Sequence, residues 1–522
     1  MSINFDLKRK QQGFGAITNY ISHFQSELRD ILSSHQEIET QNHPQGISSY
    51  LIRKIHALTP LSVFIPKEFG GWGGTAKDCL SLLEATSYES IAVGLMFGIN
   101  GSLFIDPVAK YAKKAVQSHV FGKFIMENAM GGLMITEPDF GTEALAMQTA
   151  YRKTATGYAI QGTKHWGGLT GMADFWLVTA REDKGNGKLG RDIAMFVTEM
   201  NDPKQHIEVV EFYHKLGLFL IPYGRNEIDI EVSADQRLQP KSLGIKMLMD
   251  SLHRSRLRLS GIGMGFIKRL LDEAIQHAQE RYIGGKNLLQ FDQVQYRLAE
   301  IQTFFTLTSG LCHFASAKTQ LSSDLFGLGL QANAMKALLT DMMQEAAQSL
   351  MQLAGAKGFR RDHIAGRAIV DCRPFQIFEG SNDVMYNQVA EAVMKKMVKI
   401  RRFNLYEYLS SHNEARAAAP EMKPSIDASI DINMSQRQKI AMGKAISHIL
   451  ALNHAMNMSN TGFRSDLIHQ AIQITKKRVE SIMINLNRYP VLGVIEDYHS
   501  AGDWKVCAEK QAPAGTRNCK TS

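Results

Sequence analysis

The chain has 522 residues, of which 44% are hydrophobic and 21% charged, a composition typical of globular proteins and a length sufficient for several domains. Only 13 prolines and five scattered cysteines without C-x-x-C spacing argue against a disordered chain, a disulfide framework and a zinc site. The excess of 59 Lys and Arg over 51 Asp and Glu gives a net charge of +8, which favours anionic partners without naming one.

The amino-terminal segment lacks the apolar core of a secretion signal. No stretch reaches the ~18 consecutive apolar residues that a membrane span needs, so we expect no signal peptide and no transmembrane span. The cysteine pattern fits a reducing compartment, and we expect a cytoplasmic protein. Nucleic acid is not favoured as a partner, because the basic run after Lys395 fits a solvated helix end.

Residues 1–130 are predicted to form a helical domain. Tyr20, Ile21, Phe24 and Leu28 recur at steps of three and four residues, as one buried helix face requires. Residues 64–75 interrupt this pattern, because a proline and four glycines favour a loop.

Residues 131–240 are predicted to form a β domain. Short β-branched or alternating runs, such as those beginning at Tyr158, Phe175, Ile193 and Ile228, are separated by turns rich in Gly, Asn and Asp. A sheet between two helical layers follows from this order.

Helical patterns return over residues 241–402, where long runs rich in Ala, Met, Leu and Gln lose little side-chain entropy in a helix. Residues 403–433 are predicted to be a linker, since they contain two prolines and no sustained periodicity. Residues 434–522 are predicted to form a helical carboxy-terminal extension, on the basis of an apolar stripe that includes Ile468, Ile472 and Val479.

Two segments near the start of the β domain could bind a ligand. The loop within Leu133 to Ala144, LMITEPDFGTEA, offers backbone N–H groups and hydroxyls to a phosphate or a flavin edge, although turn chemistry explains it equally well. Trp166 lies among small residues and could lie flat against a planar ring, or could simply anchor the core.

Two further segments lie in the second helical region. The glycines between Gly261 and Gly265 are not a dinucleotide fingerprint, because no strand precedes them. Glu379 follows apolar residues and precedes Gly380, so its carboxyl is expected at a helix entry beside apolar bulk. Desolvation there would raise its pKa toward the range of a general base, whereas a helix cap or an arginine partner is the structural alternative.

Together, in this order and in this helix-sheet-helix setting, these four segments resemble the acyl-CoA dehydrogenase family of flavoproteins. The match includes IPKEFGGWGG near residue 65, KLG at Lys215 and FDQVQYRLAEI from Phe291, and it covers roughly residues 15–400. The resemblance implies an α+β multi-domain fold with amino-terminal helices, a central β-barrel-like domain and a carboxy-terminal four-helix bundle. Residues beyond the match would be an appendage, and the assembly would be a homodimer or homotetramer.

The resemblance also implies the site. The base would be Glu379. Some relatives instead place the base on the helix that begins near the family's arginine, which is matched here by Arg256, but the corresponding position in this chain is Ser255. The implied substrate contacts are Thr142, Arg256 and Gly380. The implied FAD contacts are Leu133, Thr136, Thr142, Trp166, Lys286, Gln352, Ala356 and Ser381.

Two departures from the family pattern concern the cofactor. The family's WITN sequence is here Trp166-Gly-Gly-Leu169, which removes a hydroxyl that reaches the flavin in relatives. The R-x-x-F-G loop, which contacts FAD across the subunit interface, is shortened to GGKNLLQF with Lys286 as its cation.

The implied reaction is α,β-dehydrogenation of an acyl thioester carried by coenzyme A or by an acyl carrier protein. Glu379 would remove the α-proton while the β-carbon passes a hydride to flavin N5. An electron-transfer flavoprotein would reoxidise the flavin. A flavin oxidase or monooxygenase on the same fold and a non-catalytic flavin-bearing binding protein remain alternatives.

Overall fold

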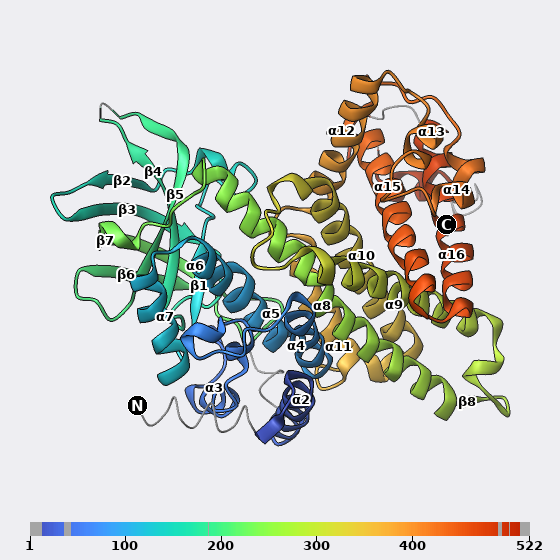
Figure 1. Ribbon diagram of the computed structural model, residues 1–522. Coiled ribbons are helices and arrows are strands. Elements are labelled where there is room, and N and C mark those ends of the chain that lie inside the picture. Colours follow the sequence, from blue (N-terminus) through green and yellow to red (C-terminus); the bar gives the residue numbers. More distant parts are fainter. Residues whose placement is uncertain (1–12, 36–42, 186, 489–492, 501, 512–522) are drawn as a thin grey trace, which may run out of the picture.

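The fold is taken from a computed structural model that describes residues 13–35, 43–185, 187–488, 493–500 and 502–511 (Figure 1). The curled sheet lies at one end of the molecule and the long helices at the other, with the amino-terminal helices beside both. The predicted α+β architecture and its order of helical, β and helical domains are confirmed. The exact domain boundaries stay predictions.

The amino-terminal domain is helical, as its apolar periodicity predicts. Tyr20, Phe24 and Leu28 share one face of the first described helix and are all buried. The helices of this domain are α2 (Ile17–Ser33), α3 (Ser49–His56), α4 (Ala76–Glu89), α5 (Ile91–Gly98), α6 (Asp106–Tyr111) and α7 (Lys114–Met126).

A π-helical segment, Ile99–Ile105, joins α5 to α6 without a break. The continuous helix Ile91–Tyr111 is long and apolar enough to cross a membrane by length and composition alone, but 89% of its most apolar window is buried inside the protein. The packed core therefore accounts for its apolar side chains.

The middle domain is a seven-stranded sheet within the described part of the chain, with the order β1-β4-β2-β3-β7-β6 and with β5 paired to β4. β4 pairs in parallel with β1, which places Gly131 opposite Phe175 and Met134 opposite Val178. The strands are β1 (Gly131–Met134), β2 (Ala150–Lys153), β3 (Gly157–His165), β4 (Phe175–Asp183), β5 (Leu189–Glu199), β6 (Gln205–Phe212) and β7 (Gly224–Ser233).

Four long helices form the predicted bundle: α8 (Gly244–Glu280), α9 (Asp292–Lys318), α10 (Gly329–Ala354) and α12 (Asn382–Ile400). The short α11 (Ile364–Cys372) lies between α10 and α12 in the chain. A small hairpin, β8 (Tyr282–Ile283) and β9 (Lys286–Asn287), connects α8 to α9.

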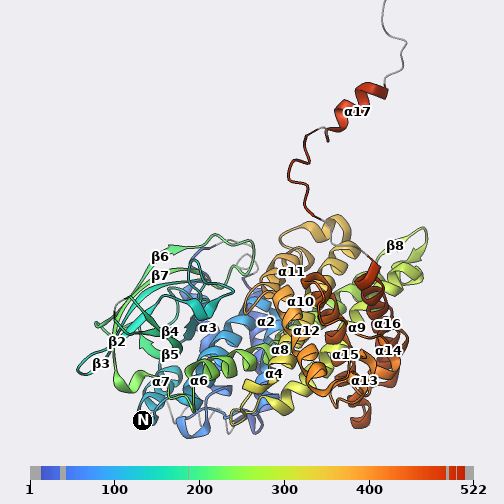
Figure 2. The same ribbon diagram turned by 90° about the horizontal axis from the view of Figure 1, so that it is seen from above.

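The carboxy-terminal extension packs against the bundle. Its helices are α13 (Leu405–Ser410), α14 (Ala419–Ile426), α15 (Gln436–Asn457), α16 (Ser465–Arg488) and α17 (Trp504–Gln511). α15 packs against α9, α10, α12 and α16, and nearly every residue from Met442 to Ala455 is buried. Viewed from above, α15 and α16 lie with the bundle, whereas α17 stands apart (Figure 2).

The segment 403–433, predicted as a linker, is folded structure instead. It contains α13 and α14, and Leu405, Tyr408 and Met422 are buried at 2% exposure or less. Helices of six and eight residues are too short to show a helical period in the sequence, and Pro424 stands inside α14.

Buried ion pairs join the amino-terminal helices to the bundle. Arg258 on α8 donates from Nη1 to Asp106 on α6 at 2.5 Å, and both side chains are at most 5% exposed. The Arg258 Nη2 also donates to the Thr319 carbonyl at the end of α9. Lys110 on α6 contacts Asp250 on α8 at 2.9 Å, so two pairs connect the same two helices.

Replacing one member of a buried pair leaves the other charge without compensation. We therefore expect Arg258→Met to lower the free energy of unfolding by about 3–5 kcal/mol, because Asp106 remains buried and unpaired. Urea unfolding followed by circular dichroism measures this change. Arg464→Met, which breaks the exposed Arg464–Asp466 pair, is the control and should leave the urea midpoint unchanged. Equal urea midpoints for the two variants would contradict a stabilising role of the Arg258–Asp106 pair.

Candidate active site

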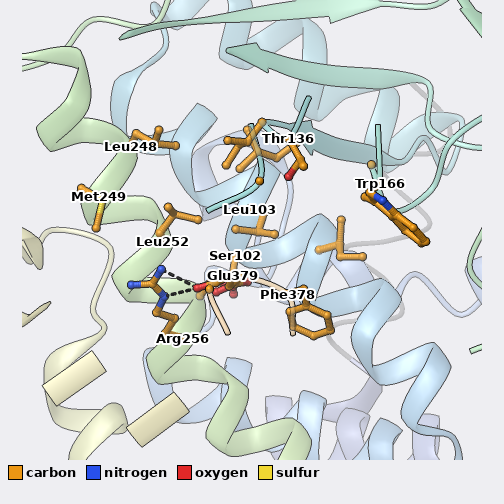
Figure 3. Close-up of a pocket in the computed structure, with 18 of the residues that line it drawn as sticks. Ser102, Leu103, Thr136, Trp166, Leu248, Met249, Leu252, Arg256, Phe378 and Glu379 are labelled. Atoms are coloured by element: carbon orange, nitrogen blue, oxygen red, sulfur yellow. Dashed lines mark hydrogen bonds between the residues drawn. The ribbon is translucent and has the colours of Figure 1, made fainter. Parts of the chain in front are cut away.

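A cavity of about 910 Å³ lies where the three domains meet. Its wall comes from the π-helical segment, the loop after β1, the turn at Trp166, one face of α8 and the turn before α12. Leu103, Leu248 and Leu252 give it an apolar lining, and Arg256 and Glu379 lie together on one side (Figure 3). Its size and lining are typical of small-molecule sites.

The turn before α12 has an uncommon backbone conformation. Glu379 has φ of 54° and Gly380 has φ of 99°, so two successive residues occupy the left-handed region. This region is unfavourable for a residue with a side chain, and its occupation by Glu379 requires support from its surroundings.

Two buried cations supply that support through the carbonyls of the turn. Arg256 on α8 donates to the Glu379 carbonyl from Nε at 3.1 Å and from Nη2 at 2.7 Å. Lys336 on α10 donates to the Gly380 carbonyl at 2.7 Å. Both carbonyls of the left-handed pair are therefore held by charged donors from separate bundle helices.

The Glu379 carboxyl has one bound oxygen and one unbound oxygen. Its Oε1 accepts a hydrogen bond from the Ser255 hydroxyl at 2.7 Å. Its Oε2 is buried without a hydrogen-bond partner. An oxygen in this environment can accept a proton without first breaking a hydrogen bond within the protein.

Burial raises the pKa of Glu379 above its usual range. Arg256, the Ser255 hydroxyl and Lys336 each lower it, but they do not offset the desolvation. The raised pKa agrees with the expectation from the sequence. The role of Glu379 as a base stays a prediction.

Lys336 is a site residue that sequence reasoning missed. Its side chain is fully buried, and burial lowers its pKa to about 7. It also donates to Asn382 Oδ1 at 3.1 Å, which connects α10 to the first residue of α12. The signal in the sequence was a lysine within an otherwise apolar run, at the helical spacing of Leu339 and Met343.

Arg256 lines the cavity, but its guanidinium is committed to protein groups. Besides the Glu379 carbonyl, it donates from Nη1 to Asn333 Oδ1 at 2.7 Å. It therefore supports the turn, and its predicted contact with the substrate stays a prediction. Gly380, the other predicted contact, also lines the cavity.

Trp166 borders the cavity with a half-exposed ring, at 54% exposure, and so is not the core anchor of the alternative interpretation. Its φ is 58°, and its ring centroid lies 4.5 Å from that of Tyr213. Gly167 and Gly168 follow it along the cavity wall. The hydroxyl of Thr170 donates to the Gly167 carbonyl and is buried, so it does not replace the hydroxyl missing from this segment.

β1 places Leu133 on the cavity wall, and the loop after it places Thr136 and Thr142 there. A buried ion pair fixes its course, because Glu137 Oε1 accepts from Lys164 on β3 at 2.9 Å. Burial lowers the pKa of Lys164 to about 8. Sequence reasoning missed this pair, whose members are 27 residues apart.

The other predicted cofactor residues do not line this cavity. Lys286 is exposed in the β8–β9 hairpin, and Gln352 and Ala356 are exposed near the end of α10. Ser381 is the first flanking residue of α12, next to the Glu379 turn. The roles that the resemblance implies for these four residues stay predictions.

Comparison with known proteins identifies the three domains. The chain matches the acyl-CoA dehydrogenase N-terminal domain over residues 22–127, the middle domain over 132–229 and the C-terminal domain over 243–394. It is 24% identical over 339 residues to an acyl-CoA dehydrogenase of Bacillus subtilis, covering 64% of this chain and 86% of the relative.

Two solved structures add detail to the fold. An acyl-CoA dehydrogenase complexed with FAD from Bacillus anthracis has a TM-score of 0.72 at 16% identity, covering 89% of this chain and 86% of that one. The prolyl acyl carrier protein oxidase AnaB has a TM-score of 0.63 at 16% identity, covering 71% of this chain and 98% of that one. The larger coverage of the first structure extends beyond the three matched domains.

The raised pKa of Glu379 makes stability depend on pH in a defined direction. Its contribution is fully present below the unfolded carboxyl pKa and is lost as pH rises through the higher folded value. We expect Glu379→Gln to be more stable than the parent at pH 8, with the difference shrinking toward pH 5. Urea midpoints at both values measure it.

Glu137→Gln is the matched control, because the pKa of Glu137 is lowered: burial raises it, and Lys164 with several hydrogen bonds more than compensates. Its contribution is present above the unfolded pKa and lost as pH falls, so this variant should be less stable than the parent at pH 8. The same pH trend in both variants would refute the electrostatic assignment of Glu379.

Proposed function

Because the chain belongs to the acyl-CoA dehydrogenase family, we propose that it is an acyl thioester dehydrogenase in which Glu379 removes the α-proton of the substrate. Membership of this family confirms the predicted enzyme class, an oxidoreductase acting on CH–CH bonds, and the predicted FAD cofactor. The identity of the base and of the substrate is the proposal.

The cavity fits the cofactor by the chemistry of its wall. Trp166 offers a partly exposed ring face, Gly167 and Gly168 add no side chains beside it, and the hydroxyl-bearing Thr136 and Thr142 lie nearby. The flavin of FAD is a flat, largely apolar ring system with polar edges, and these features suit it. When bound, FAD supplies the acceptor for the hydride that leaves the β-carbon.

Glu379 supplies the proton transfer. The α-hydrogen of a saturated thioester is weakly acidic, so its removal requires a base of raised pKa and a donor for the developing enolate oxygen. The carboxyl lies at the cavity with one oxygen held by Ser255 and the other unbound. The family resemblance implies that the backbone N–H of Glu379 itself donates to the thioester oxygen.

The surrounding residues hold the Glu379 carboxyl in position beside apolar side chains. Arg256 and Lys336 hold the carbonyls of the left-handed turn, so the carboxyl cannot swing away with its backbone. The leucine side chains of the π-helical segment and α8 give the same volume an apolar wall. The single observation that carries the proposal is this enclosed carboxyl with a raised pKa at the wall of the cavity.

The direct test is Glu379→Gln. We expect kcat to fall by about 10²- to 10⁴-fold, while the purified variant keeps its FAD, because the amide preserves the shape but cannot accept the proton. Anaerobic mixing with a panel of saturated acyl thioesters, followed by flavin absorbance, measures the reductive step.

Glu273→Gln, on an outer face of α8 and paired with Arg269, is the control and should react like the parent. Unchanged turnover in Glu379→Gln would exclude base catalysis by this residue. Full biological function without any turnover would favour the flavin-bearing binding protein.

The remaining parts of the proposal rest on the family and the cavity. The acyl group of the substrate is linked as a thioester to coenzyme A or to an acyl carrier protein. An electron-transfer flavoprotein accepts the electrons. The protein acts in the cytoplasm as a homodimer or homotetramer. A supporting observation for a carrier-bound substrate is the fold similarity to AnaB, which acts as a prolyl acyl carrier protein oxidase.

A second candidate function is an acyl thioester oxidase. The observation that favours it is the fold similarity to AnaB, which is named as a prolyl acyl carrier protein oxidase. The test is an oxygen electrode with substrate and no other acceptor. A dehydrogenase consumes oxygen much more slowly than it reduces an artificial dye, whereas equal rates would establish the oxidase.

A further inference from the structure

The carboxy-terminal extension reaches the Glu379 turn through a chain of polar contacts. Lys444 on α15 contacts Asp341 on α10 at 3.2 Å, and Asp341 contacts residues on both sides of Glu379. We propose that the extension helps to position the Glu379 turn, and that it does so through the contact of Lys444 with Asp341. This inference rests on the proposed role of Glu379 as the base.

Asp341 is the residue at which these polar contacts meet. Its Oδ1 accepts hydrogen bonds from Gln376 Nε2 and from Asn382 Nδ2, each at 2.7 Å. Gln376 lies three residues before Glu379 and Asn382 three residues after it. One carboxylate therefore ties together both ends of the segment that carries the base.

The hydrogen bonds continue from Asn382 to the Glu379 turn. While its Nδ2 donates to Asp341, its Oδ1 accepts from Lys336 at 3.1 Å. Lys336 in turn donates to the Gly380 carbonyl at 2.7 Å. Lys444, Asp341, Asn382 and Lys336 thus form a continuous path from α15 to the backbone of the left-handed pair.

Charge explains why Lys444 matters to Asp341. Asp341 has a side chain only 13% exposed, and burial would raise its pKa. Lys444 is the largest opposing influence, followed by the donors Gln376, Asn382 and Tyr386, and together they hold the pKa below its usual range. Asp341 is therefore ionised and accepts hydrogen bonds only, which fixes the orientation of its partners.

Two further polar side chains interact with this pair. His448, one turn further along α15, is buried, and its pKa is lowered to about 3 by burial and by Arg478 and Lys444, so it is neutral. Tyr386 on α12 donates its hydroxyl to Asp341 Oδ2 at 2.9 Å.

Backbone packing fixes the position of Lys444. Its neighbour Gly443 lies so close to α12 that an added Cβ would be 1.9 Å from the Tyr386 carbonyl oxygen. Only a glycine allows α15 to approach α12 at this point. The close approach at Tyr386 lies about one helical turn after Asn382, so α15 meets α12 near the end that follows Glu379.

The test compares two lysines of α15. Lys444→Met removes the cation on Asp341, whereas Lys439→Met removes a different contact from α15 to α12, the Lys439–Glu391 pair at 3.2 Å. We expect Lys444→Met to lower kcat roughly tenfold with little change in KM, because Lys444 does not line the cavity. Lys439→Met should keep the parent kcat.

A second set of readouts separates positioning from general stability. Lys444→Met should keep its bound FAD and its melting temperature near those of Lys439→Met, and Lys444→Arg should recover most of the lost kcat. Tyr386→Phe, which removes another donor to Asp341, should lower kcat in the same direction. The α-deuterium isotope effect on kcat should increase in Lys444→Met, because proton removal becomes slower relative to product release.

Equal kcat for Lys444→Met and Lys439→Met would overturn the proposal while leaving Glu379 as the base. Loss of FAD or a large fall in melting temperature in Lys444→Met, with no rescue by arginine, would also overturn it in favour of a purely structural role. Failure of the proposed function itself has a different signature, namely parent-like turnover in Glu379→Gln.

Discussion

The active site depends on a backbone conformation that the residue carrying the chemistry does not favour. Glu379 and Gly380 are both left-handed, and the carbonyl of each is held by a buried cation, Arg256 from α8 or Lys336 from α10. Because the strain falls on a residue with a side chain, the turn persists only while the bundle helices keep these donors in place. The helices thereby determine where the carboxyl lies.

The same two cations set the electrostatic balance of the site. Each lowers the pKa of Glu379, and desolvation raises it by more, so the carboxyl is a stronger base than one in water. Directing both cations at backbone carbonyls rather than at the carboxylate preserves this balance, since a direct ion pair would lower the pKa much further. The Ser255 hydroxyl occupies one carboxyl oxygen without adding charge.

Much of the architecture was predictable from local patterns, because helical and strand periods reflect which face is buried. Glu379, Thr136 and Trp166 could be located since each belongs to a short segment with a distinctive composition. Lys336, Asp341 and Lys444 could not, because their importance arises from contacts between helices that are distant in the sequence.

The error at residues 403–433 has a related cause. Short helices with buried alanines and methionines, such as α14, carry too few residues to establish a period, and their prolines suggested an open chain. α14 packs against α13, α15 and α16, and α15 and α16 in turn pack against the bundle. The extension therefore belongs to the structural account of the active site rather than to a separate module.

The central claim is that Glu379 itself removes the α-proton. The most direct measurement is hydrogen exchange in D2O at the α-carbon of a thioester that has no β-hydrogen, such as phenylacetyl-CoA, followed by mass spectrometry. The account predicts deuterium incorporation with the parent enzyme and essentially none with Glu379→Gln. Equal incorporation by both proteins would contradict it.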